Sequence, residues 1–288
     1  MAEDLGRLPE MSKWIRSNSV AVIYAVLFLI TALPILSPLG LPISIGPTTR
    51  KFASIIDSLK KDDIVFVDIN FSPGSWAENG PQLAVIMKHL WTKGVKVLFF
   101  SLAVDGPQMY MKAIGQATPP PSLKYGVDWV YLGYLSGAET AAAAITKDTW
   151  SLVKSDYFGT PLQNLPIMQK IRTAEDAQLL IVVTSGEMSW MWVRQWYERY
   201  RKTYLLAPIS IMVPSGAPYQ QAGQIAAILA GSRGAAEYEV LIAKPGEGAT
   251  VTDALTMQLL YLMCLIIIGN VIFYTQRKGR RTSATGGI

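Results

Sequence analysis

The chain has 288 residues, of which 50% are hydrophobic and only 16% charged, against the roughly 25% charged residues of an ordinary soluble domain. Its net charge is +5, but residues 46–253 hold 19 Lys and Arg against 18 Asp and Glu, and four basic residues near the C-terminus supply the rest of the excess. This balance excludes a broad basic surface over the middle of the chain, so we expect no nucleic-acid partner.

An apolar segment follows a short N-terminal tail (residues 1–18) and runs from about residue 20 to residue 36. Basic residues in the tail favour a cytoplasmic start for this segment. We expect a transmembrane helix with an apolar, proline-rich exit over residues 19–45, in which Pro34 kinks or ends the helix. A cleaved signal peptide is the alternative, because it shares the basic start and the short apolar run.

The middle of the chain, residues 46–252, alternates short β-rich runs with longer amphipathic ones. Continuously apolar strands belong to sheets that are covered on both faces, and a βαβ alternation requires parallel pairing. We therefore predict an extracytoplasmic α/β domain, a three-layer Rossmann-like sandwich with a mainly parallel sheet. Strands are expected at residues 63–69, 95–101, 129–133, 179–184 and 207–213, and helices at 81–91, 108–116, 188–202 and 219–230.

Polar and small residues follow the predicted strands, at the edge where such sheets bind ligands. A small-molecule site is one interpretation, and turn and helix-cap chemistry alone is the other, because it favours the same residue types. The carboxylates in this group could also converge on a hard cation such as Mg²⁺ or Ca²⁺, although their spacing is not diagnostic. The candidate ligand-binding residues are Asp68, Asn70, Ser72, Gly74, Asp105, Glu139, Ser185 and Glu187.

The sequence lacks the motifs that identify a nucleotide or zinc site. No predicted strand is followed by Gly-x-Gly-x-x-Gly, and Gly-x-x-x-x-Gly-Lys-Ser/Thr does not occur. The middle region has one histidine, His89, and no cysteine, which argues against a zinc site or a Ser-His-Asp apparatus. We expect His89 to be a structural residue within a helix, and we expect no cofactor and no bound metal.

A short part of the middle region is similar to a known enzyme class. The run from Asp68 to Ser75, with the helix and the strand that follow, resembles the opening βαβ unit of the membrane-anchored signal-peptide-peptidase and ClpP class of serine proteases. The match covers about residues 63–107, and in that class the loop supplies an oxyanion hole while the next strand leads to the nucleophilic serine. Here residues 103–107 contain no serine, so the resemblance implies a serine-protease-like fold without the nucleophile.

The helix expected at residues 188–202 carries aromatic side chains on more than one face, whereas packing on a sheet needs one apolar stripe. We expect this surplus to contact another subunit or the membrane surface, unless a large sheet buries it. The helix expected at 219–230 repeats small residues, which allows close helix packing. The candidate contact residues are Trp190, Trp192, Trp196, Tyr200, Gly223, Ala227 and Gly231.

A second apolar segment, residues 253–275, is long enough to cross a hydrocarbon core of about 30 Å as a helix. The basic tail that follows it, residues 276–288, is expected to remain cytoplasmic. With both tails cytoplasmic, the α/β domain lies outside the cytoplasm. Residues 254–275 contain no charged side chain, which argues against a transport path through one chain.

These features predict a two-pass cell-membrane protein whose outer domain self-associates in a structural or scaffolding role. Its expected partners are the lipid bilayer and further copies of the same chain. The competing hypothesis is a membrane-tethered enzyme or small-ligand sensor that uses the strand-end loops. A third possibility, a channel formed by a ring of subunits, needs a polar face shared across the oligomer.

Overall fold

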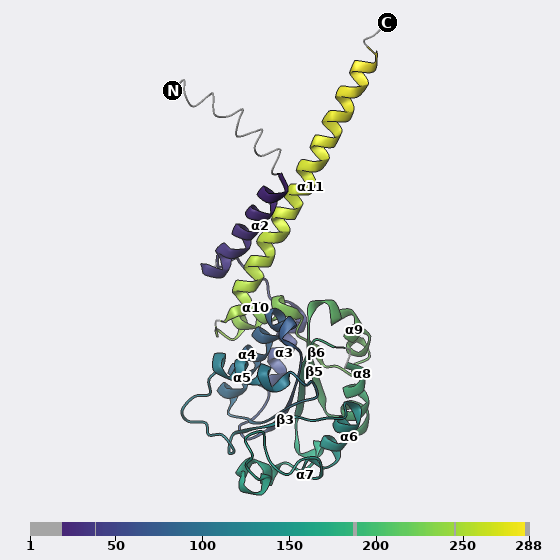
Figure 1. The fold of residues 1–288 in the computed structure, drawn as a ribbon. Coiled ribbons are helices and arrows are strands. Elements are labelled where there is room, and N and C mark those ends of the chain that lie inside the picture. The colour runs from purple at the N-terminus through teal and green to yellow at the C-terminus, as the bar shows by residue number, and fades with distance from the viewer. Residues whose placement is uncertain (1–18, 38, 187–188, 245, 286–288) are drawn as a thin grey trace. The chain divides into compact units, whose positions relative to one another are not determined.

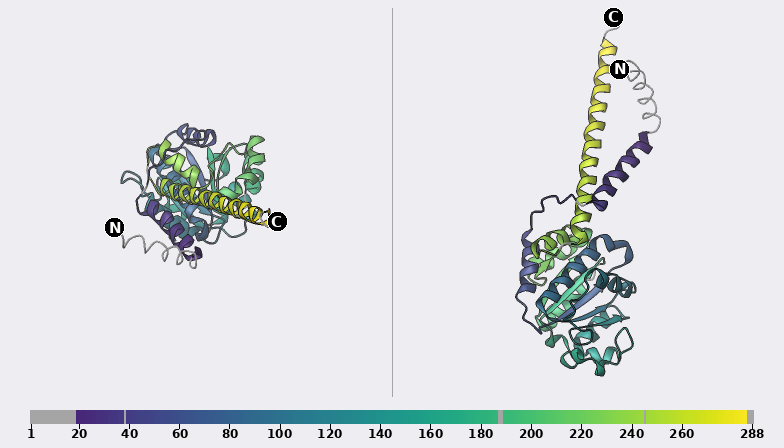
Figure 2. Two further views of the ribbon diagram at one scale, coloured as in Figure 1. Left: turned by 90° about the horizontal axis from the view of Figure 1, so that it is seen from above. Right: turned by 90° about the vertical axis from the view of Figure 1, so that its left-hand side faces the viewer.

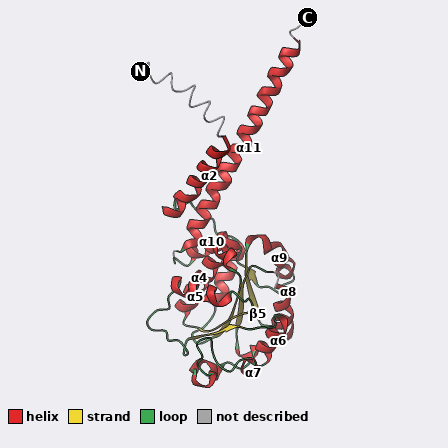
Figure 3. Ribbon diagram, in the orientation of Figure 1, coloured by secondary structure: helices red, strands yellow, loops and turns green. Residues whose placement is uncertain are grey.

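The computed structural model describes residues 19–37, 39–186, 189–244 and 246–285. The chain divides into two compact units. Residues 42–249 form the α/β unit, and residues 1–41 together with 250–288 form the other, which contains both apolar segments. All strands of the described residues belong to the α/β unit (Figure 3).

One six-stranded sheet forms the centre of the α/β unit, and all its neighbouring strands are parallel. The strand order is β3-β2-β1-β4-β5-β6, so the winding direction reverses between β1 and β4. This is the order of a doubly wound, Rossmann-like sheet, and the predicted α/β class with a parallel sheet is confirmed. The strands are β1 (Ile64–Asn70), β2 (Lys96–Ser101), β3 (Trp129–Tyr134), β4 (Leu179–Thr184), β5 (Thr203–Pro208) and β6 (Ala227–Ile228).

Helices cover both faces of the sheet, and Figures 1 and 2 show the layers from three sides. Side chains alternate between the faces along a strand, so Val67 of β1 enters one apolar core and Phe66 the other. The first core is covered by α3 (Pro47–Asp57), α4 (Trp76–Lys93), α5 (Gly106–Gln116) and α10 (Gly231–Leu241). The second is covered by α6 (Glu139–Lys147), α7 (Thr149–Leu152), α8 (Ser189–Trp192), the π-helix η5 (Val193–Glu198) and α9 (Val213–Gln221).

Short 3₁₀ turns complete the α/β unit. The turn η1 leads from β1 into α4, and η6 leads from β5 into α9. Their bounds, with those of three turns between α7 and β4, are η1 (Pro73–Ser75), η2 (Leu162–Asn164), η3 (Pro166–Lys170), η4 (Ala174–Asp176) and η6 (Ser210–Met212).

Both predicted apolar segments are helical. They form α2 (Ser19–Leu36) and α11 (Glu247–Thr285), and each is long and apolar enough to cross a membrane by length and composition. Their large apolar side chains are exposed, for example Phe28 at 71% and Leu259 at 62%. Pro34 is accommodated inside α2, so the expected helix end at this residue is replaced by an end at Leu36.

Hydrogen bonds join the two apolar helices in an antiparallel pair. The amide of Gln258 donates to the hydroxyl of Thr31 (2.8 Å), and the hydroxyl of Tyr261 donates to the carbonyl of Ile23 (3.1 Å). Just after α2, two backbone N–H groups donate to the carboxylate of Asp253, each at 3.0 Å. Polar groups that pair with one another inside an apolar helix pair avoid the cost of an unsatisfied donor in hydrocarbon.

Helices α3, α6, α7 and α10 were not predicted, and two of the predicted elements lie elsewhere. The fifth strand, expected at residues 207–213, lies at Thr203–Pro208, where it pairs with all six residues of β4. The helix expected at 219–230 does not form: α9 ends at Gln221, and β6 then adds to the sheet beside β5. A continuous apolar run such as residues 225–230 has no periodicity that separates strand from helix, and pairing with β5 decides the outcome.

Candidate functional site

The loops that follow β1 and β4 meet at the carboxyl edge of the sheet. The backbone N–H of Ser185, after β4, donates to the carbonyl of Asn70 at the end of β1 (3.2 Å). Ser72 and Gly74, between β1 and α4, are exposed at the same edge. These four predicted residues therefore lie at the point where the winding reverses, which is where folds of this type bind ligands.

Asp68 does not reach this edge, so its assignment to a ligand site is corrected. Its side chain is fully buried in β1, where its carboxylate accepts the indole N–H of Trp192 (2.9 Å) and the backbone N–H of Leu102 (3.2 Å). Burial raises the pKa of Asp68 to about 7, because the interior disfavours the charged form more than these hydrogen bonds favour it. Asp68 ties β1 to α8 and to the loop after β2 from within the core.

Asn70 has an incompletely satisfied side chain at the same edge. The residue is only 7% exposed, and its side-chain nitrogen makes no hydrogen bond of good geometry within the described residues, although the amide interacts with the Asp68 carboxylate and lowers the pKa of that group. A buried donor without an acceptor costs about 1–3 kcal/mol. An acceptor atom on a ligand bound between β1 and β4 would remove that cost.

The loop after β2 is closed by Ser101 and Gly106. The buried hydroxyl of Ser101 donates to the carbonyl of Ile69 (2.6 Å), which ties the end of β2 to β1. A Cβ at Gly106 would overlap Ser101 Oγ, so only glycine lets α5 begin this close to the strands. Ser101 is therefore a packed structural hydroxyl, while Asp105 next to Gly106 is exposed at the start of α5.

The predicted carboxylates do not gather around a common point. Glu139, at the start of α6, accepts hydrogen bonds from Arg194 and Gln195 of η5, each at 2.8 Å. Asp68 is buried and Asp105 is exposed, while Glu187 lies outside the described residues. Within the described ranges, no group of three or more His, Cys, Asp or Glu side chains could hold a metal ion. The possible cation site finds no support in this geometry.

The aromatic segment is divided between core and surface. Trp192 and Trp196 are both fully buried in the second core, so their assignment as contact residues is corrected. Tyr200 is half-buried, and its hydroxyl donates to the carbonyl of Thr146 (3.2 Å). Trp190 is 40% exposed, with the guanidinium of Arg194 above its ring at 4.4 Å. The large sheet therefore accounts for most of the aromatic surplus.

The small residues expected to form a helical stripe belong to three different elements. Gly223 lies in the loop after α9 with φ of +74°, Ala227 is buried in β6, and Gly231 begins α10. The predicted packing stripe is therefore wrong. At Gly231 a Cβ would overlap Ser210 and Glu78, whose carboxylate accepts the backbone N–H and the hydroxyl of Ser210. Gly231 is required by this close approach.

The carboxyl edge also exposes large apolar side chains. Four strands each have one such residue at or after their end: Tyr134 ends β3, Val104 follows β2, Trp190 follows β4 and Ile211 follows β5. Their exposed fractions are 40% for Tyr134, 72% for Val104, 40% for Trp190 and 78% for Ile211. We call these four the strand-end apolar residues. They share the carboxyl edge of the sheet, on both sides of β1.

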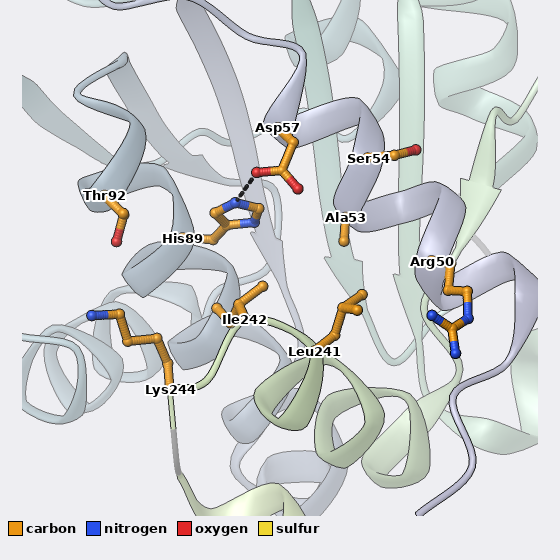
Figure 4. A pocket seen from close by; sticks show the side chains of 9 residues that line it. All are labelled: Arg50, Ala53, Ser54, Asp57, His89, Thr92, Leu241, Ile242 and Lys244. Carbon is orange, nitrogen blue, oxygen red and sulfur yellow. Dashed lines mark hydrogen bonds and ion pairs between the residues drawn. The ribbon is translucent and has the colours of Figure 1, made fainter.

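A pocket that the sequence did not indicate lies among α3, α4 and the end of α10 (Figure 4). Its volume is about 460 Å³. It contains His89, whose Nδ1 lies 2.7 Å from the hydroxyl of Tyr238 and whose Nε2 lies 3.0 Å from Asp57 Oδ1. The lone histidine in mid-helix was the only signal in the sequence. The lining residues are Arg50, Ala53, Ser54, Asp57, His89, Thr92, Leu241, Ile242 and Lys244.

Comparison of the chain with models of known protein families, with curated proteins and with solved structures finds no match. The serine-protease resemblance of residues 63–107 therefore stays a prediction. The chemistry of the site follows from the residues of this chain alone.

Proposed function

We propose that the chain is a two-pass cell-membrane protein whose α/β unit self-associates through its carboxyl edge and serves a scaffolding role. The observation that carries this proposal is the set of strand-end apolar residues, which are exposed at the carboxyl edge of the sheet. A second copy of the chain is the proposed occupant of this edge.

Membrane insertion is supported by the exposed apolar surface of α2 and α11. In water such a surface would drive aggregation, whereas lipid solvates it at no cost. The polar pair Thr31–Gln258 satisfies its own hydrogen bonds, as a helix pair in hydrocarbon requires. Basic residues in both tails favour the orientation with both ends in the cytoplasm and the α/β unit outside it.

Self-association is supported by the confinement of the anchored chain to the membrane plane as well as by the strand-end apolar residues. Copies of a membrane-anchored chain meet in two dimensions with restricted orientations, which raises their effective concentration. A moderate apolar patch then suffices for assembly. The exposed rings of Tyr134 and Trp190 are residue types enriched at protein–protein contacts.

The test is the size of the complex of the full chain in lipid nanodiscs or mild detergent, measured by mass photometry. The variant Val104→Glu with Ile211→Glu places two charges on the edge and should convert the assembly to monomers. The matched control is Val127→Glu, an exposed valine just before β3 and therefore at the opposite edge of the sheet. A wild-type monomer, or dissociation caused equally by the control, would exclude this proposal.

A second candidate function, small-ligand sensing at the β1–β4 edge, is favoured by the buried amide of Asn70, whose nitrogen makes no hydrogen bond of good geometry with the described residues. The variant Asn70→Leu removes the donor at similar volume. Sensing predicts that nucleotides, sugar phosphates or carboxylic acids raise the melting temperature of the wild type and that Asn70→Leu abolishes this shift. Scaffolding alone predicts no such shift and an unchanged assembly of the variant.

A further inference from the structure

The pocket among α3, α4 and the end of α10 has the size and the wall of a small-molecule site. Its volume of about 460 Å³ falls within the roughly 300–1,000 Å³ of ligand pockets. Ala53 of α3 and the pair Leu241 and Ile242 at the end of α10 form its apolar floor. All these residues belong to the α/β unit, so the pocket is complete within that unit.

One wall of the pocket is a fixed chain of three hydrogen-bonded groups. Because the carboxylate of Asp57 can only accept, Nε2 of His89 carries the proton and donates to it (3.0 Å). Nδ1 then accepts the hydroxyl proton of Tyr238 (2.7 Å). Burial lowers the pKa of His89, which keeps the ring neutral and this arrangement intact near neutral pH. The wall is therefore rigid, and its own polar groups are already paired.

The two cationic side chains of the pocket, in contrast, are free to bind a ligand. Arg50 and Lys244 are exposed, and neither side chain forms a hydrogen bond or an ion pair with another described residue. Figure 4 shows them at opposite ends of the lining, with Leu241 and Ile242 between them. Asp57 lies two helical turns from Arg50, roughly 10 Å along α3, so it does not neutralise the guanidinium.

We propose that this pocket binds an amphiphilic anion, a phosphate or carboxylate head joined to an aliphatic chain. The planar guanidinium of Arg50 offers paired donors to the head group, which matches the geometry of both anions. The chain lies on the floor formed by Ala53, Leu241 and Ile242, where about 0.8 kcal/mol is gained for each buried methylene group. Lys244 adds attraction from the other end of the pocket. The proposal does not depend on self-association.

Occupancy of the pocket would act on the connection between α10 and α11. Leu241 ends α10, α11 begins at Glu247, and Lys244 lies in the turn between them. Two residues before the end of α10, the carboxylate of Glu239 accepts the N–H groups of Gly248 and Ala249 (3.0 and 3.1 Å). A ligand held by Leu241, Ile242 and Lys244 would therefore contact the end of α10 and the residue that follows it toward α11.

The experiment is calorimetric titration of hexyl phosphate into the full chain in phosphatidylcholine nanodiscs, with empty discs subtracted. We expect saturable binding that Arg50→Gln weakens about tenfold, because the loss of one charge-assisted hydrogen bond lowers the affinity by about that factor. Lys244→Gln should weaken binding less. The matched control is Lys51→Gln, the next residue of α3, which does not line the pocket. Inorganic phosphate, which has the head without the chain, should bind at least about tenfold more weakly.

Three results would overturn the proposal: no saturable heat above empty discs, equal weakening by Arg50→Gln and Lys51→Gln, or equal affinity for inorganic and hexyl phosphate. Discs that also contain phosphatidic acid distinguish the source of the anion. Competition with hexyl phosphate, lost in Arg50→Gln, supports the pocket and assigns a lipid head group. Undiminished hexyl phosphate binding in these discs supports the pocket and assigns a free amphiphile.

Discussion

A carboxyl group inside a sheet depends on the few donors that the fold can offer it. Asp68 receives hydrogen bonds from Trp192 and from the backbone of Leu102, and the amide of Asn70 adds a weaker interaction. Its pKa is about 7 in the folded chain against an ordinary value of 3.8. Between these values the folded state holds a proton that the unfolded chain has released. The free energy of unfolding therefore falls as the pH rises through this window, and the loss is complete above about pH 7.

The variant Asp68→Asn tests this coupling, because asparagine keeps an acceptor oxygen but cannot ionise. We expect the wild type to lose up to about 4 kcal/mol of unfolding free energy between about pH 4 and pH 7, and the variant to lose most of that slope. The measurement is chemical unfolding of the full chain in detergent across this range. Asp105→Asn, at an exposed carboxyl, is the control, and a slope that survives in Asp68→Asn would contradict the assignment.

The sequence could not assign Asp68 correctly, although it located the strand. An acidic residue near the end of an apolar run fits a ligand edge as well as a buried position. Two facts decide between them: β1 extends to Asn70, and the side chain of Asp68 meets an indole N–H more than a hundred residues away in sequence. Such a long-range partner has no local signal. The exposure of Ser72 and Gly74, which depends only on the turn after the strand, was easier to anticipate.

At the scale of elements, the start of α5 depends on one close approach. A Cβ at Gly106 would overlap Ser101 Oγ and lie 2.8 Å from the backbone oxygen of Ile69, which cannot move without shifting β1. Gly106→Ala should therefore cost about 1–3 kcal/mol of unfolding free energy. Gly115→Ala is the matched control on the same helix, since nothing lies within 4 Å of its Cβ position.

The control is expected to stabilise the chain by about 0.5–1 kcal/mol, because alanine favours the helix more than glycine does. Opposite signs for the two substitutions, read from thermal unfolding in detergent, would establish the close approach. A neutral Gly106→Ala would mean that α5 begins farther from the strands.

The beginning of α11 depends on a carboxylate of the preceding helix. Glu239 is 4% exposed and accepts two N–H groups of the first turn of α11, where the helix dipole also favours a negative charge. Burial raises the pKa of Glu239 despite these donors. Glu239→Ala leaves the donors unpaired and should cost about 1–3 kcal/mol, as measured by unfolding of the full chain.

Val240→Ala is the control for this prediction, because Val240 is the next residue of α10 and is 52% exposed. Its effect should stay within about 0.5 kcal/mol. If both substitutions cost the same, the contribution comes from the helix propensity of α10 and not from the cap of α11.

The elements that the sequence predicted well are those with strong local patterns. The first four strands are continuous apolar runs between turns, and each lies within one residue of its expected bounds. The predictions of a strand at residues 207–213 and of a helix at 219–230 were wrong, because the apolar runs in these regions are also compatible with other structures. Ala227 and its neighbours have helix propensity, yet pairing with Leu205 and Leu206 holds them in the sheet.

At the scale of the whole molecule, the parallel sheet followed from the βαβ alternation, but the strand order and the pocket did not. The pocket joins Arg50, His89 and Lys244, which only the packing of three helices brings together. The strand-end apolar residues were missed for the same reason, since single exposed side chains on four loops form a pattern only after the sheet is assembled. The exposed apolar surface of α2 and α11 was expected from composition alone.

The proposed two-pass arrangement leads to the last prediction, which concerns the sidedness of the chain. Cys264 is the only cysteine, so replacing it with serine gives a background for single-cysteine variants. In intact cells a membrane-impermeant maleimide should label Ser72→Cys, which lies on an exposed turn of the α/β unit. Ser12→Cys and Ser283→Cys, in the two tails, should react only after the membrane is opened, because basic flanking residues hold both tails inside.

Each alternative gives a different labelling pattern. Labelling at residue 72 with loss of the N-terminal tail from the mature chain would indicate a cleaved signal peptide and a single crossing. Labelling of both tails with protection of residue 72 would invert the topology. In that case the α/β unit, with its carboxyl edge and its pocket, would lie inside the cell.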